Sequence, residues 1–264
     1  MPSPEETIDN LRLVITEPLS IIADPKAGRF LGAAIEEFED LAIAVACIHL
    51  FERADVEAYA RGLQLCGFAR QHFLRRTQAT MEVDDLYSAA SRAQGDLAAY
   101  VAGDDALFTD IVSRSAAEPL GGEYEDDFRY RKILHALMSG PIDDQQLALL
   151  IDQFERARQG KEASRSALCR AFQEGDQEEF WPAFATLHAD VEKQRASPTG
   201  TDDPWPEIYR RIWLEGLVWL AVARRLRGWP SPEAEYPLCP SWGRRRQTPP
   251  TAGENIFLTL PIRK

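Results

Sequence analysis

Cysteine is scarce in this sequence, and its spacing excludes the common redox and zinc motifs. Cys47, Cys66, Cys169 and Cys239 lie far apart, so the chain has neither a CxxC pair nor the spacing of zinc ligands. Three of the four stand inside apolar helical patterns, where cysteine usually acts as a small buried side chain. We therefore expect reduced thiols.

Histidine is equally rare, and the common catalytic motifs are missing. His49, His72, His135 and His188 have no second histidine four residues later and no carboxylate three residues earlier, which argues against zincin and helical di-iron sites. Gly160-Lys161 lacks the earlier glycine and the following serine or threonine of a phosphate-binding loop, and there is no GxGxxG run or GxSxG elbow. The sequence therefore predicts that the protein is not an enzyme and has no catalytic, metal or cofactor-binding residues.

Long hydrophobic runs are also absent. The longest, Leu41 to Ile48 and Leu217 to Ala223, are far shorter than the roughly 20 residues that cross a bilayer. The N-terminus has no basic segment followed by an apolar run, so we expect no cleaved signal and a cytoplasmic location. Thirty basic and 42 acidic residues give a net charge of -12, which disfavours nucleic acid and anionic membranes as partners and favours basic proteins.

What the sequence does have is helical periodicity. Apolar residues recur at helical spacing between Phe30 and Ile48, and a second such segment follows Asp55, which can cap it. Two later segments, Leu97 to Phe108 and Leu168 to Phe180, each indicate a helix, a Gly-Asp turn and another helix, because glycine ends one helix and aspartate caps the next. We expect an all-α fold of about nine helices, arranged as an irregular bundle of helical hairpins.

The same patterns suggest the domain organisation. We expect one helical domain over residues 1–242, which the polar stretches Glu118 to Asp127 and Ala196 to Pro204 can divide into lobes at 1–122 and 123–242. Residues 243–264 form a Pro/Arg-rich extended tail, with a short terminal strand or strap from Ile256 to Leu260. The uneven spacing of the hairpins favours an irregular bundle over a solenoid of regular repeats.

A long apolar helix is predicted from Glu207 to Arg227. Trp213 and Trp219 belong to its buried positions, and Glu215 is the one charged residue among them. One interpretation of Glu215 is structural, as the partner of an arginine or of a helix end. The other is a functional carboxylate.

Two acidic clusters are the remaining candidates for a binding surface. The first, Glu36, Glu37, Glu39 and Asp40, lies mostly on the polar side of its helix; the second, Glu123, Tyr124, Glu125, Asp126 and Asp127, lies in a connection. Charge runs are often only solvated surface. A tyrosine among acids nevertheless suits contact with a basic protein surface.

The segment from Ser164 to Trp242 carries a family resemblance. Its order of helix, Gly175-Asp176 turn, helix, polar break and long apolar helix, with the run Leu214 to Ala221, resembles the immunity protein 49 family of bacterial polymorphic-toxin systems. Members of that family neutralise a toxin by binding it. The resemblance implies an antitoxin that blocks the active site or substrate surface of a cognate toxin without a cofactor, and a fold role for Glu215 and Gly216. It is weaker over the N-terminal part and does not cover the tail.

Two other functions remain open. A helical-repeat adapter would collect peptide segments in a concave groove, and the repeated Gly-Asp hairpins favour it. An enzyme would use Glu215 with one of the histidines, and a strongly raised carboxylate pKa in a cleft would be its simplest sign.

Overall fold

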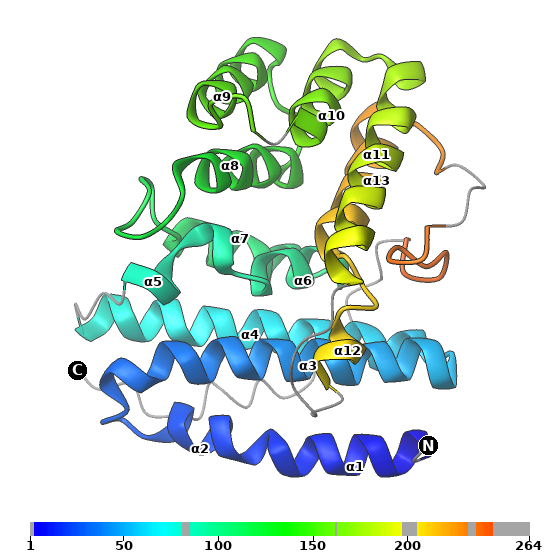
Figure 1. Ribbon diagram of the computed structural model, residues 1–264. Helices are drawn as coiled ribbons and strands as arrows, with labels where there is room; N and C mark the ends of the chain where they lie inside the picture. Colours follow the sequence, from blue (N-terminus) through cyan, green and yellow to red (C-terminus); the bar gives the residue numbers. More distant parts are fainter. Residues whose placement is uncertain (1–2, 81–84, 162, 197–204, 232–235, 245–264) are drawn as a thin grey trace.

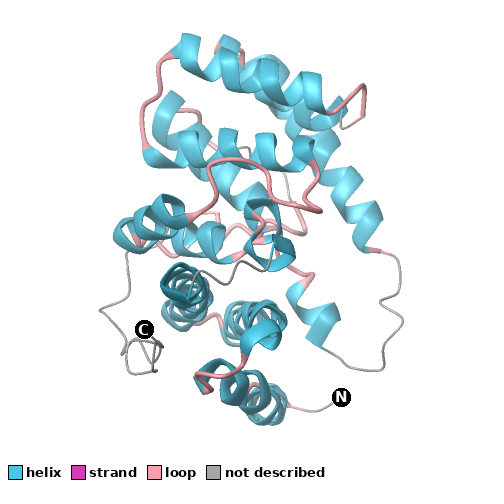
Figure 2. Cartoon of the chain, turned by 90° about the vertical axis from the view of Figure 1, so that its left-hand side faces the viewer, coloured by secondary structure: helices cyan, strands magenta, loops and turns pink. Residues whose placement is uncertain are grey.

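The computed structural model describes residues 3–80, 85–161, 163–196, 205–231 and 236–244. Within these ranges the regular structure is entirely helical, and Figure 2 shows helices joined by loops and turns. The all-α prediction is therefore confirmed. Thirteen α-helices occur in the described ranges. The expected number of about nine was low partly because two of them, α5 (Asp85–Ser88) and α12 (Trp205–Tyr209), are only four and five residues long.

The helices stack as successive layers of hairpins (Figure 1). The N-terminal layers contain α1 (Pro4–Val14), α2 (Thr16–Ala23), the short η1 (Gly28–Phe30), and the long pair α3 (Leu31–Arg53) and α4 (Val56–Thr80). Above them lie α5 (Asp85–Ser88), η2 (Ala90–Arg92), α6 (Gly95–Val101) and α7 (Asp105–Arg114). The hairpins α8 (Glu125–Ser139) with α9 (Asp144–Ala157), and α10 (Ala163–Glu174) with α11 (Gln177–Arg195), complete the stack.

Local sequence signals fix the predicted Gly-Asp turns. Gly103 and Gly175 have φ of 86° and 73°, a left-handed conformation that glycine adopts without steric cost. The carboxylate of Asp104 then accepts a hydrogen bond from the amide of Leu107 at 3.0 Å, and that of Asp176 accepts one from Glu179 at 3.0 Å. Both aspartates thus satisfy an amide that the first turn of a helix leaves free, and both predicted turns are confirmed.

One large hydrophobic core runs through the stack. It takes residues from most of the helices, from Ile22 in α2 to Val222 in α13 (Leu214–Arg227), so the two predicted lobes share it. Trp213 and Trp219 are buried, as the apolar pattern predicts. All four cysteines are free and buried. Among the described residues no helix has the length and apolar character needed to cross a membrane.

The predicted helix from Glu207 to Arg227 is wrong in one respect, because it is broken in two. The structure has α12 (Trp205–Tyr209) and α13 (Leu214–Arg227), with Trp213 in an extended conformation between them. The amide of Trp213 donates to the carbonyl of Leu238 at 2.8 Å instead of to a carbonyl one turn back. The indole of Trp213 then lies on Gly216, where an added Cβ would be only 2.1 Å from the ring.

The predicted tail lies mostly outside the described residues. Of residues 243–264, only Gly243 and Arg244 are described, and the amides of both donate to the carbonyl of Pro240. The expected strand from Ile256 to Leu260 is among the residues that the structure does not describe.

Candidate functional site

The second acidic cluster lies only partly in a connection: Glu123 and Tyr124 precede α8, as expected, whereas the other three residues belong to the helix. Glu125, Asp126 and Asp127 form the first turn of α8, where carboxylates interact favourably with the positive end of the helix dipole. Tyr124 is the residue before the helix; its side chain is 76% exposed and makes no capping hydrogen bond. Its aromatic ring is therefore available at the surface.

Only part of this cluster is open. The carboxylate of Glu123 accepts hydrogen bonds from the amides of Ser91 at 2.8 Å and Leu120 at 3.1 Å, so it holds the loop together. Asp127 pairs with Arg165 at 2.9 Å. We call the remaining exposed or half-buried side chains, Tyr124, Glu125 and Asp126, the Tyr124 patch.

The first acidic cluster is divided between surface and interior. Glu37 is exposed, but Glu39 is only 3% exposed, and Glu36, Glu39 and Asp40 all line a pocket. The expectation that the four acids lie on a polar, outward side of their helix is therefore wrong for Glu39. Residues 92–97 and α12 cover this side of α3. The same side would be exposed if α3 were an isolated helix.

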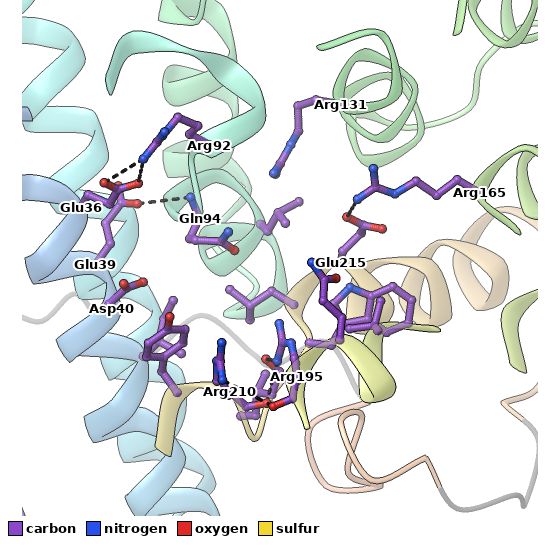
Figure 3. A pocket seen from close by; sticks show the side chains of 18 residues that line it. Glu36, Glu39, Asp40, Arg92, Gln94, Arg131, Arg165, Arg195, Arg210 and Glu215 are labelled. Carbon is purple, nitrogen blue, oxygen red and sulfur yellow. Dashed lines mark hydrogen bonds and ion pairs between the residues drawn. The ribbon is translucent and has the colours of Figure 1, made fainter. Parts of the chain in front are cut away.

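The pocket has a volume of about 420 Å³ and is bounded by elements from both halves of the sequence (Figure 3). We call it the central pocket. Its charged residues are Glu36, Glu39 and Asp40 from α3, Arg92 from η2, Arg131 from α8, Arg165 from α10, Arg195 from α11, Arg210 after α12, and Glu215 from α13. The arginines bring positive charge to a protein whose overall charge is strongly negative.

The side of the pocket formed by α3 is acidic. Glu36 pairs with Arg92 at 2.9 Å, and Oε2 of Glu39 accepts the amide of Gln94 at 3.2 Å (Figure 3). The other oxygen of Glu39, Oε1, is buried without a hydrogen-bond partner. Burial, together with the smaller effect of neighbouring carboxylates, raises the pKa of Glu39 to about 8 and that of Asp40 to about 7. Both groups therefore exchange protons near neutral pH.

The opposite side, between α11 and the break before α13, is basic. Nη1 of Arg195 donates to the carbonyls of Arg210 at 2.7 Å and Ile212 at 2.6 Å, and Nη1 of Arg210 donates to the carbonyl of Arg195 at 3.4 Å. Burial lowers the pKa of Arg195. The two guanidinium groups are thus held by each other's main chain, and within the described residues Arg195 forms no ion pair with a carboxylate.

Glu215 lies at the edge of this pocket within a hydrogen-bonded chain. Its Oε1 accepts from the hydroxyl of Tyr130 at 2.8 Å, and that hydroxyl accepts from Nε1 of Trp219 at 2.8 Å. Arg165 lies 3.6 Å from the other oxygen. Glu215 therefore has an arginine partner and also faces the pocket.

No histidine lines the central pocket, which removes the geometric basis for a Glu215–histidine pair. His135 is instead buried against Asp96 at 2.6 Å. Burial alone would raise the pKa of Asp96, but the charge of Arg131 and the hydrogen bond from His135 bring it to about 2. The part of the chain that the structure describes contains no cluster of three or more potential metal ligands.

The arginines of the pocket were missed by sequence reasoning. They come from five separate segments, and no spacing along the chain relates them. The sequence held one signal for two of these pocket arginines: Arg195 and Arg210 flank the polar stretch from Ala196 to Pro204.

A scan against protein-family models, a search of curated proteins and a search of solved structures found no match to this chain. The arguments for function therefore come from its own residues.

Proposed function

We propose that the protein is an immunity protein that binds a cognate antibacterial toxin in the cytoplasm and neutralises it by covering its active site or substrate surface. The Tyr124 patch is the contact surface in this proposal. The observation that carries it is the exposure of Tyr124, at 76%, beside carboxylates in the first turn of α8.

The side chain of Tyr124 is suited to protein recognition. Tyrosine combines a large apolar ring with a hydroxyl that can form hydrogen bonds, and it is enriched at protein interfaces. None of the hydrogen bonds within the described residues uses this hydroxyl, and the ring lies outside the hydrophobic core. A partner that covers the ring gains apolar burial without having to break an existing contact.

The charge around Tyr124 favours a basic partner. Glu125 and the exposed Glu118 share a single cation, Arg129, at 3.3 and 3.8 Å, and Asp126 adds another negative charge. The overall charge of -12 has the same sign. Complementary charge of this kind accelerates encounter more than it strengthens the final complex, and added salt weakens it.

The proposal is tested in cells that express the protein encoded beside this one, with and without this chain, followed by co-purification. Growth arrest that this chain relieves, together with a stable complex, supports immunity by binding. Relief without a complex would contradict binding and favour catalysis. Several weak partners in place of one tight partner would favour the adapter.

A charge-reversal pair locates the contact. Glu125→Lys with Asp126→Lys is expected to slow association with the toxin by roughly tenfold at low salt, with a smaller effect at high salt. Glu178→Lys with Glu179→Lys is the matched control, because these exposed acids also occupy the first turn of a helix, α11. Asp127 is left unchanged because it pairs with Arg165. Equal slowing by both pairs would exclude the Tyr124 patch as the specific contact.

A further inference from the structure

Arg195, the last residue of α11, is a partly buried cation without a carboxylate partner. It lines the central pocket, and none of the ion pairs within the described residues includes it. The charge of Glu215 acts on Arg195, but that carboxylate is held by Tyr130 and Arg165. Burial lowers the pKa of Arg195, and a bound counter-charge would oppose this effect. What this side of the pocket lacks is an anion.

The free edge of Arg195 is shaped for a carboxylate. Nη1 donates to the carbonyls of Arg210 at 2.7 Å and Ile212 at 2.6 Å, and these two bonds fix the plane of the guanidinium group. Nε and Nη2 bind no acceptor among the described residues, and neither atom is enclosed by the protein, so a ligand can reach both. Their N–H bonds lie parallel on one edge of the group, which is the two-donor arrangement that a carboxylate accepts.

The carboxyl groups on the α3 side of the pocket do not supply the missing charge. Glu36 pairs with Arg92 at 2.9 Å, and Glu39 is almost fully buried. Asp40 faces the pocket from the side opposite Arg195 (Figure 3). With a pKa of about 7, Asp40 is ionised in part of the molecules at neutral pH and repels a second negative group there. The pocket therefore favours a ligand with one negative charge over a dianion.

We propose that the central pocket binds a small organic monocarboxylate, with its carboxylate on the Nε–Nη2 edge of Arg195 and its apolar body against Val191 and the ring of Tyr209. Both of these side chains line the pocket and are only partly buried, so a ligand can contact them. The volume of about 420 Å³ is within the range of small-molecule sites.

Other ligand classes satisfy fewer of these groups. An amine would bring a second positive charge towards Arg195 and would leave its free donors without an acceptor. Inorganic phosphate would accept from the same edge, but it carries more negative charge towards Asp40 and has no apolar part to bury against Val191.

The test begins with calorimetric titration of the full-length protein with straight-chain, branched and aromatic monocarboxylates. The acid that binds most tightly is then compared with its primary amide, which keeps the body and loses the charge, and with inorganic phosphate. We expect the amide and phosphate to bind at least tenfold more weakly than the acid. Equal binding of the amide would show a cavity that ignores charge, and equal binding of phosphate would show an unselective anion site. Either result would overturn the proposal, as would failure of every acid to bind at millimolar concentration.

Replacing the guanidinium group tests the contact with the carboxylate. Arg195→Lys keeps the positive charge but removes the pair of parallel donors, and it should weaken the acid at least tenfold. Arg224→Lys is the matched control, because Arg224 is exposed on α13 and does not line the pocket. Urea denaturation of both variants shows whether they fold. Equal affinity of a folded Arg195→Lys variant and the control would contradict the contact.

A second substitution leaves Arg195 and its main-chain bonds in place. Val191→Phe enlarges a side chain that lines the pocket, so it should exclude the apolar body of the ligand and weaken the acid at least tenfold. Lys193→Phe is the control, because Lys193 is exposed on the same helix and lies outside the pocket lining. Unchanged affinity of Val191→Phe would mean that the acid binds elsewhere.

The central pocket and the Tyr124 patch share no residue. The carboxylate titrations need no toxin, and toxin neutralisation needs no carboxylate, so the two proposals fail or succeed separately.

Discussion

Replacing Glu39 by glutamine is expected to stabilise the protein at neutral and alkaline pH. The folded protein holds this carboxyl in its neutral form, with a pKa of about 8 in place of 4.5, mainly because it is buried. Arg70 from α4 and the Gln94 amide favour the charged form, whereas Asp40 and Asp96 oppose it. Burial outweighs the favourable contacts.

The magnitude follows from proton linkage. Because the folded pKa is raised, the stability that Glu39 contributes is fully present below pH 4.5 and is lost as the pH rises through about 8. Each pH unit in this interval costs about 1.4 kcal/mol. Between pH 5 and pH 8 the free energy of unfolding of the wild type should therefore fall by about 3 kcal/mol through this group alone. Glutamine cannot ionise and removes that loss.

The assay is urea denaturation of wild type and Glu39→Gln at pH 5 and pH 8. Any fixed cost of an amide in place of a carboxyl cancels when the two pH values are compared. The advantage of the variant should grow by about 3 kcal/mol from pH 5 to pH 8, and Glu178→Gln, at an exposed position, is the control. A constant difference between wild type and Glu39→Gln would mean that Glu39 is ionised in the folded protein, and the reasoning about the acidic side of the pocket would be refuted.

Two further substitutions test the packing around α13. Gly216→Ala should lower the free energy of unfolding by about 2 kcal/mol in urea denaturation, because the new Cβ would be 2.1 Å from the Trp213 ring. This overpacking costs more than the alanine gains in helix propensity. Unchanged stability would contradict the position of the indole. Tyr130→Phe removes the hydroxyl that joins Trp219 to Glu215 and should cost about 1–3 kcal/mol by the same assay. If Tyr130→Phe changed the near-ultraviolet circular dichroism but left the free energy of unfolding unchanged, the hydrogen bonds from Trp219 through Tyr130 to Glu215 would not be needed for stability.

The features that could be predicted from the sequence are those encoded locally. The Gly-Asp turns require only a left-handed glycine and an aspartate that caps the following amides, and both signals lie within a few residues. The helical class follows from periodicity alone. The buried positions of Trp213 and Trp219 follow from the apolar pattern of their segment.

The features that could not be predicted depend on contacts between distant segments. The break before α13 depends on the hydrogen bond from Trp213 to Leu238, which no pattern near Trp213 indicates. Glu39 belongs to a polar run, but α12 and residues 92–97 cover its side of α3. A helical pattern shows which residues share a face, and it does not show what another helix places over that face.

The most direct measurement of the central proposal is a titration of purified toxin activity with this protein. Neutralisation by binding predicts that activity falls in proportion to added protein and reaches its minimum at a fixed stoichiometric ratio, and that the Glu125→Lys, Asp126→Lys variant loses this effect under conditions in which the Glu178→Lys, Glu179→Lys control retains it. Complete inactivation by a small fraction of that ratio would indicate catalysis, and undiminished toxin activity at excess protein would contradict an immunity function.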